Sequence, residues 1–264
     1  MLTHCRRFVQ SAQYTRIPLG HTAEDMERIC LDLFERNKSE LPAGDDLITW
    51  MIASRGVDPP SRNPLDAARP TIVAFNMPVN YQRFAKFYRQ GVHLVTAATR
   101  RTPAECLDPR AKITNKMNHV MAEFEAKSVD PEAFALMLDT DGLVAEASFA
   151  NIFFVRDGRV FTPRSKNILL GIMRENVMET APQANVDIVE GDFSPYDLYL
   201  AEEIFITTTS FSILPVGKVN GRDVSGGVPG PVTSRLMSAW SRSIGVDFVD
   251  QALSHLSPGE RLGL

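Results

Sequence analysis

The sequence contains few cysteines, and their spacing argues against two common kinds of site. Only three occur in 264 residues, namely Cys5, Cys30 and Cys106. Three scattered cysteines are too few for a disulfide framework, and no cysteine or histidine spacing matches a zinc site. We therefore expect reduced thiols, a cytoplasmic location and no bound metal.

Long apolar runs and an excess of one charge are also missing. No stretch approaches the roughly 18 apolar residues of a membrane span, and the first residues lack the apolar core of a signal peptide. The 28 basic and 32 acidic residues give a formal net charge of -4 and form no basic stripe. Because nucleic-acid binding needs such a stripe, we expect neither a membrane nor a nucleic acid as partner.

The first part of the chain predicts a helix followed by two short strands. Residues 23–37, "AEDMERICLDLFERN", have apolar side chains at helical spacing and charges on the other face. Residues 46–56 and 69–77 favour strands, and the proline-rich stretch between them, "GVDPPSRNPLDAA", predicts a long loop.

A domain boundary is predicted where periodicity stops. Residues 98–110, "ATRRTPAECLDPR", are rich in proline and arginine and follow neither a helical nor a strand pattern. We therefore expect a smaller N-terminal domain over 1–99, a linker over 100–109 and a C-terminal domain over 110–264.

The C-terminal part predicts mixed α and β structure. Two Asp-Gly pairs, at 141–142 and 157–158, punctuate residues 133–163 and indicate hairpins in a strand meander. A helical pattern follows Gly171, and the β-rich run "LAEEIFITTTSFSILPV" follows that helix. The apolar helix predicted over 234–248 suits a core position and an interface equally well.

Several residues have the chemistry of a cofactor site. Gly171 before a helix start presents the backbone N–H groups of Ile172 and Met173, which suit a phosphate, and the hydroxyls of residues 207–210 add further donors. Glu146 lies in an apolar strand pattern, where a carboxylate needs a cationic or protonated partner. Lys112 is either an ordinary surface lysine or a nucleophile. A lysine, a carboxylate and phosphate-binding groups are the parts that hold pyridoxal 5'-phosphate.

The order of the motifs resembles a known family. They are, in sequence order, "AKITN", "FEA", "DGLVAEASFANIFFV", "GRVFTP", "LLGIMR", "LAEEIFITTT", "ILPV", "VNG" and "GGVPGPVT". They are similar to those of the class IV aminotransferases of pyridoxal-phosphate fold type IV, which include branched-chain and D-amino acid aminotransferases. The resemblance implies an α+β fold with a smaller N-terminal α/β domain and a larger C-terminal mixed domain containing a strand meander or barrel-like sheet.

The resemblance also implies roles for particular residues. Lys112 is expected to form the Schiff base with pyridoxal 5'-phosphate, and Glu146 to pair with the ring nitrogen. The opening segment "HCRRFVQS" is similar to the family's His-x-x-Arg helix, in which the arginine reaches the phosphate. The remaining phosphate-binding residues are then Arg7, Ile172, Met173, Thr208 and Thr209, and the expected substrate residues are Arg55, Arg62 and Ser210.

The activity implied is transamination, with a branched-chain-type amino acid as donor and a 2-oxo acid such as 2-oxoglutarate as acceptor, in a homodimer. Three alternatives stay open. "GIMR" and "FANIFF" also resemble aminodeoxychorismate lyases, and a D-amino acid or (R)-amine donor is compatible with the same motifs. Because the chain starts almost at the His-x-x-Arg helix, we expect the family's opening strands to be missing, and an inactive truncated relative is the third alternative.

Overall fold

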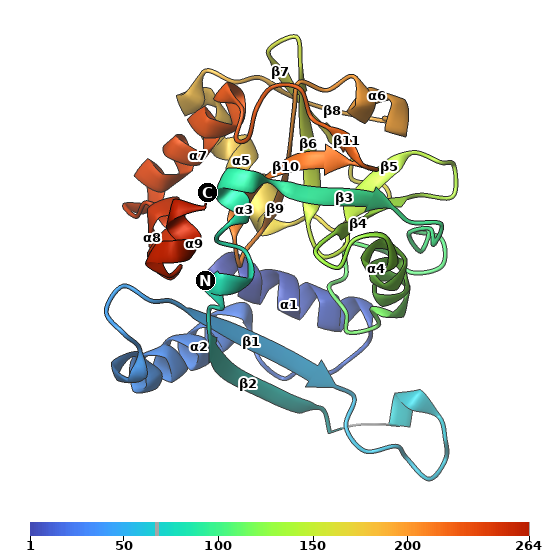
Figure 1. The fold of residues 1–264 in the computed structure, drawn as a ribbon. Coiled ribbons are helices and arrows are strands. Elements are labelled where there is room, and N and C mark those ends of the chain that lie inside the picture. The colour runs from blue at the N-terminus through green and yellow to red at the C-terminus, as the bar shows by residue number, and fades with distance from the viewer. Residues whose placement is uncertain (67–68, 264) are drawn as a thin grey trace. The chain divides into compact units, whose positions relative to one another are not determined.

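The structure, a computed structural model, describes residues 1–66 and 69–263, so that residues 67 and 68 of the expected loop lie outside it. The α-helices are α1 Leu2–Tyr14, α2 Ala23–Asn37, α3 Phe87–Gln90, α4 Met117–Val129, α5 Ile172–Thr180, α6 Pro195–Tyr199, α7 Pro231–Ile244, α8 Phe248–Ser254 and α9 Pro258–Leu262. The strands are β1 Leu47–Ser54, β2 Thr71–Pro78, β3 Val92–Thr96, β4 Phe134–Leu138, β5 Val144–Ala147, β6 Asn151–Arg156, β7 Arg159–Pro163, β8 Ile188–Gly191, β9 Glu203–Thr208, β10 Ser212–Val219 and β11 Arg222–Asp223 (Figure 1).

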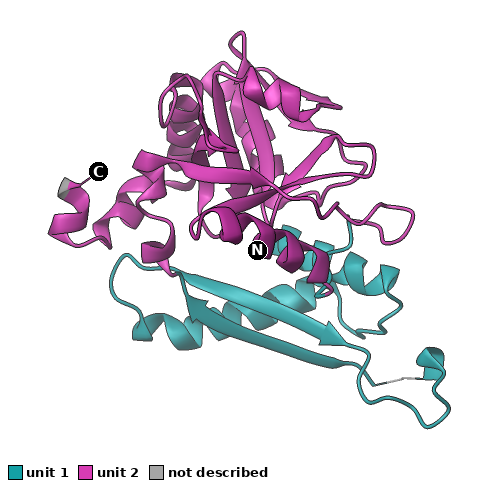
Figure 2. Cartoon of the chain, turned by 45° about the vertical axis from the view of Figure 1, so that its right-hand side comes forward, with its two compact units in different colours: residues 1–79, 110–114 teal, residues 80–109, 115–264 magenta. Residues whose placement is uncertain are grey.

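The chain divides into two compact units (Figure 2). Unit 1 consists of Met1–Val79 with Arg110–Thr114, and unit 2 of Asn80–Pro109 with Asn115–Leu264. The boundary expected at residue 99 and the linker expected over 100–109 stay predictions, and the compact units differ from them by placing residues 80–109 in unit 2. The reason is long-range pairing, because β3 lies parallel to both β4 and β10 and brings the segment after it into unit 2.

In unit 1, α2 begins at a capping box, in which the side chains of Thr22 and Asp25 each accept a backbone N–H from the other residue. Its apolar face forms a buried cluster of Cys5, Met26 and Cys30 with α1. Strands β1 and β2 pair antiparallel along their full length, and their side chains Met51 and Ile72 pack against the same cluster. The predicted helix and strand pair are confirmed.

In unit 2, the described strands form one sheet in the order β5-β4-β3-β10-β9-β6-β7-β8, with β11 paired to β10. A bridge between Ala147 and Ala150 joins the end of β5 to the start of β6, which is five strands away from β5 in the sheet. The sheet therefore curls on itself, as the resemblance predicted. Both Asp-Gly hairpins are present, and at the second one Asp157 and Gly158 have positive φ values of 52° and 71°. These values fit a type I′ turn.

Helix α4 packs closely on the sheet through small side chains, and strand β9 is buried in the core. Helix α4 packs on β3 and β4 through a cluster that contains Ala122, Ala126 and Ala135. Strand β9 is buried through Ile204, Phe205 and Ile206, so its C-terminal end emerges from a rigid part of the core. Within the described residues, no helix is both long and apolar enough to cross a membrane.

Candidate functional site

Glu146 lies on β5 and is buried in unit 2, as its place in an apolar strand pattern suggested. Its Oε1 accepts a hydrogen bond from Nε of buried Arg101 at 2.7 Å and lies 3.5 Å from Nε2 of His119 on α4. Its Oε2 accepts the backbone N–H of Leu169 at 3.1 Å. The sequence indicated that the Glu146 carboxylate needs a cationic partner, and this partner is Arg101.

Electrostatics keep this carboxylate ionised. Burial raises the pKa of Glu146, but the hydrogen bond with His119 and the positive charge of Arg101 outweigh burial, so that the pKa is lowered overall. A carboxylate has about four lone-pair positions, and three are filled by Arg101, His119 and Leu169. Among the described residues no further partner is seen, so one position is left for another N–H donor.

A second feature of unit 2 is the start of α5, where the N-cap residue is Gly171, which has no side chain to cap the helix. The first N–H groups of a helix have no acceptor within it, and here they include those of Ile172 and Met173. Because the helix dipole is positive at this end, the two N–H groups suit a phosphate, and their binding of one stays a prediction.

Gly171 is required by close packing rather than by its backbone angles. A Cβ atom at this position would lie 2.1 Å from Oδ1 of Asn151 on β6. Asn151 is itself held, since its Nδ2 donates to the carbonyl of Leu169 at 2.8 Å. The segment 169–171 is therefore a short connection. At one end the backbone N–H of Leu169 donates to Glu146, and at the other end Gly171 begins α5.

Hydroxyl groups gather at the end of β9. Thr207 lies opposite Asn151 in the sheet, and its buried Oγ1 has no hydrogen-bond partner among the described residues. Thr208 is half-buried at the last position of β9, while Thr209 and Ser210 are exposed in the turn that follows. The sequence prediction counted Thr207 among the hydroxyl donors but gave specific roles only to Thr208, Thr209 and Ser210, whereas the buried unpaired hydroxyl is that of Thr207.

Unit 1 holds a separate group of cations. Ser11 Oγ on α1 accepts the backbone N–H of Lys112 at 3.0 Å and donates to the carbonyl of Arg7 at 2.7 Å. The pKa of His4 is lowered to about 4, first by burial and then by the positive charges of Arg7 and Lys112, among others. Arg7 and Lys112, predicted from separate segments, therefore lie near one another and favour an anion.

Arg55 has a structural environment in unit 1. Its guanidinium donates to the carbonyls of Thr15 and Arg16, at the end of α1, and to the carbonyl of Pro64 in the β1–β2 loop. Arg62 lies in the same loop, with a positive φ of 55°. Arg55 thus fastens the loop to α1, and nothing in these contacts tests a role for either arginine in substrate binding.

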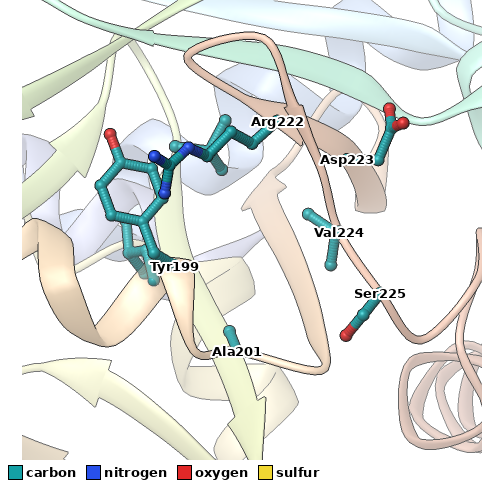
Figure 3. Close-up of a pocket in the computed structure, with 8 residues that line it drawn as sticks. Tyr199, Ala201, Arg222, Asp223, Val224 and Ser225 are labelled. Carbon is teal, nitrogen blue, oxygen red and sulfur yellow. The ribbon is translucent and has the colours of Figure 1, made fainter.

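A small cavity of unit 2 lies apart from these groups. It has a volume of about 100 Å³ and is lined by residues around β10, β11 and α6, including Tyr199, Arg222 and Ser225 (Figure 3). The Arg222 guanidinium lies 4.8 Å from the centre of the Tyr199 ring, so that the two side chains stabilise each other. None of the predicted site residues lines this cavity.

Comparison with known proteins assigns the family. The model of the family "Amino-transferase class IV" matches residues 2–219. The chain belongs to the amino-transferase class IV family. It is therefore an aminotransferase, and its two-unit fold with a curled sheet is that of fold type IV.

Similar class IV proteins carry related names. A protein of Methanocaldococcus jannaschii named "Putative branched-chain-amino-acid aminotransferase" is 30% identical over 234 residues, which are 88% of this chain and 78% of the relative. The "Branched-chain-amino-acid aminotransferase" of Escherichia coli strain K12 is 28% identical over 239 residues, 90% of this chain and 75% of the relative.

Solved structures of branched-chain aminotransferases match in fold. The structure of the enzyme from the source abbreviated "T.th.", with pyridoxamine 5'-phosphate, has a TM-score of 0.81 and 27% identity, and the match covers 99% of this chain and 80% of that one. The structure of the Escherichia coli enzyme has a TM-score of 0.80 and 25% identity, and the match covers 90% of this chain and 76% of that one.

Sequence reasoning missed three groups of this class IV site, namely Arg101, His119 and the Leu169 amide. Arg101 lies in the segment interpreted as a linker, five residues after the end of β3, where it is one of two adjacent arginines and nothing marks it as buried. His119 is one of several polar residues in its helix, so nothing in the sequence distinguished it from a residue on the solvated face. The contact of Leu169 is made by its backbone, which leaves no mark in the sequence.

Proposed function

We propose that this aminotransferase uses pyridoxal 5'-phosphate to transfer the amino group of a branched-chain-type amino acid to a 2-oxo acid such as 2-oxoglutarate. The names of the relatives support the reaction. The similar "T.th." enzyme has been solved in complex with N-(5'-phosphopyridoxyl)-L-glutamate and with 4-methylvaleric acid. The first ligand contains glutamate and the second has the branched carbon chain of leucine, which supports both halves of the proposal.

The environment of Glu146 is the observation that carries this proposal. A buried carboxylate that is held ionised and has one lone-pair position free suits a protonated ring nitrogen. When bound, pyridoxal phosphate supplies a ring that withdraws electrons from the α-carbon of the substrate. Glu146 keeps the ring nitrogen protonated, and Arg101 keeps Glu146 from taking that proton.

Phosphate binding is assigned to groups that suit an anion. The backbone N–H groups of Ile172 and Met173 offer two donors at the positive end of α5, and Thr208 and Thr209 offer hydroxyls. The proposed arginine is Arg7, which lies near the cationic side chain of Lys112, since both lower the pKa of the neighbouring His4.

Lys112 is the proposed nucleophile and proton carrier. Its Nζ holds the cofactor covalently between turnovers and, once released as an uncharged amine, moves a proton away from the α-carbon of the substrate. Ser11 fixes the Lys112 backbone through the 3.0 Å hydrogen bond, which restricts where Nζ can reach. Arg55, Arg62 and Ser210 are the proposed substrate residues, and Arg55 also supports the loop that carries Arg62.

A two-substrate assay tests the activity. Purified protein with pyridoxal phosphate should form L-glutamate from L-leucine and 2-oxoglutarate. Activity with D-alanine or (R)-1-phenylethylamine in place of L-leucine would reassign the donor, and activity with none of them would refute the proposed transfer.

The proposed assembly is a homodimer, as the resemblance implies. Sedimentation velocity of the full chain with bound cofactor should give the mass of two chains. A single species of about 29.3 kDa would contradict it.

A further inference from the structure

His119 is a buried histidine whose surroundings fix both its contacts and its charge. Its side chain is 3% exposed, and its Nε2 lies 3.5 Å from Glu146 Oε1, the atom that also accepts from Arg101. Its other ring nitrogen, Nδ1, is buried and has no hydrogen-bond partner among the described residues. The two ring nitrogens therefore have opposite environments, a carboxylate at one and no polar partner at the other.

This asymmetry selects one protonation state. A proton on Nδ1 alone would bury an N–H without an acceptor and would turn the Nε2 lone pair toward the Glu146 carboxylate. A cation would carry the same unpaired Nδ1–H, together with a charge close to Arg101 and Lys116. Only the neutral ring with its proton on Nε2 gives Glu146 a donor and leaves no donor unpaired.

Burial acts in the same direction as this hydrogen-bond count. The pKa of His119 is lowered overall, chiefly by burial, with smaller lowering contributions from the charges of Lys116 and Arg101. The hydrogen bond and the charge of Glu146 oppose the shift without reversing it. The ring is therefore neutral at neutral pH.

The chain also holds the ring in place from the strand side. Phe149, three residues after Glu146, stacks on the imidazole with ring centroids 5.5 Å apart and an angle of 24° between the ring planes. Its φ is +68°, in the left-handed region that a phenylalanine rarely adopts. A strained backbone persists only where the surrounding structure enforces it, so the contacts around Phe149 hold its ring against His119.

We propose that His119 is a positioning residue for Glu146, a neutral Nε2–H donor that, together with Arg101 and the Leu169 amide, orients the carboxylate toward the ring nitrogen of the cofactor. The inference rests on the proposed function for its consequence, but the tautomer and the hydrogen bond are properties of the chain itself. A merely structural histidine would contribute to stability without affecting Glu146.

The first test measures the tautomer in the cofactor-free full chain. Two-bond ¹H–¹⁵N correlation spectra of ¹⁵N-labelled protein distinguish protonated from unprotonated ring nitrogens, and the His119→Gln variant assigns the signal. The proposal predicts a protonated Nε2 and an unprotonated Nδ1 at pH 7. A protonated Nδ1 would overturn it, whether or not the protein proves to be a transaminase.

The second test uses a matched pair of variants. In His119→Gln the side-chain amide reaches the position of Nε2 and keeps a donor, whereas in His119→Asn the amide stops at the position of Nδ1. The dissociation constant of pyridoxal phosphate should stay within about threefold for Gln and rise about tenfold or more for Asn, the effect of losing one hydrogen bond to a charged group. Met121→Ala, at an exposed position of the same helix, is the control.

The outcomes separate the two proposals. Equal loss of affinity in the Gln and Asn variants, with equal loss of stability in urea unfolding, would show a structural role and overturn the assignment. If the unaltered protein binds no pyridoxal phosphate, the proposed function fails, and the tautomer measurement alone decides the role of His119.

Discussion

At the scale of single residues, one buried ion pair is central to the site. Arg101 and Glu146 are both almost fully buried, and each side chain would be costly in the core without the other. The sequence identified Glu146 as a carboxylate in need of a cation, but the cation itself depends on the sheet. Only the pairing of β3 with β4 brings residue 101 to β5, and no local pattern encodes that contact.

Replacing Arg101 by methionine should therefore destabilise the protein strongly. Glu146 would be left buried with its main cation removed, and we expect a loss of about 3 to 5 kcal/mol in the free energy of unfolding. Arg100→Met, at the exposed neighbouring position, is the matched control and should change it by no more than about 0.5 kcal/mol. Urea unfolding at pH 7 measures both, and equal effects of the two changes would refute the role of the pair.

Stability should also decrease in mild acid because of His4. Its folded pKa of about 4 lies below its ordinary value of 6.5, so the unfolded chain binds more protons between these values. The free energy of unfolding should consequently fall as the pH is lowered from 6.5 toward 4. The His4→Asn variant should show a shallower decline over this window in urea unfolding. An unchanged slope would show that His4 does not titrate as inferred.

At the scale of elements, two helix starts are built differently. At α5 the N-cap residue is a glycine, and the first N–H groups of the helix are the proposed phosphate donors, whereas at α7 the buried carboxylate of Glu203 accepts the N–H groups of Val232 and Thr233, each at 2.8 Å. The "GGVPGPVT" motif fits this arrangement, because a Cβ on Gly230 would lie 2.2 Å from the carboxylate carbon. The motif was recognised in the sequence, but its partner on β9 was not.

Gly171 is expected to tolerate no side chain. Gly171→Ala places a methyl group against Asn151, and overpacking of this kind costs about 1 to 3 kcal/mol. The same displacement should weaken binding of pyridoxal phosphate at the start of α5. Gly259→Ala, in α9 where a Cβ meets nothing within 4 Å, is the control and should be close to neutral. Thermal unfolding and a cofactor titration measure the two effects, and a Gly171→Ala variant as stable as the control would contradict the packing argument.

The Glu203 cap predicts a local effect on α7. In Glu203→Gln the two amides lose a charged acceptor, and we expect a loss of about 1 to 3 kcal/mol with faster hydrogen exchange at Val232 and Thr233. The exposed neighbour Glu202, changed to Gln, should leave both quantities nearly unchanged. Exchange at Val232 and Thr233 as slow in Glu203→Gln as in the unaltered chain would exclude the cap.

At the scale of the whole molecule, the sequence predicted correctly those elements whose structure depends on one continuous segment. The amphipathic pattern gave α2, and the Asp-Gly pairs gave the two hairpins, since periodicity and turn chemistry are local properties. The division into units depended instead on distant pairing. The prolines and arginines over 98–110 marked a loop that contains one crossing between the units, from Pro109 to Arg110, but no local pattern marked the crossing after Val79. That loop returns residues 110–114, and with them Lys112, to unit 1 beside Arg7.

The most direct test of the central claim is to locate the covalent link between the chain and its cofactor. Protein incubated with pyridoxal 5'-phosphate is reduced with sodium borohydride, digested and analysed by mass spectrometry, with Lys112→Ala and Lys127→Ala carried through in parallel. We expect the phosphopyridoxyl group on Lys112 in the unaltered chain and in Lys127→Ala, and no specific modification in Lys112→Ala. Modification centred on another lysine, or none in the unaltered chain, would contradict the proposed role of Lys112.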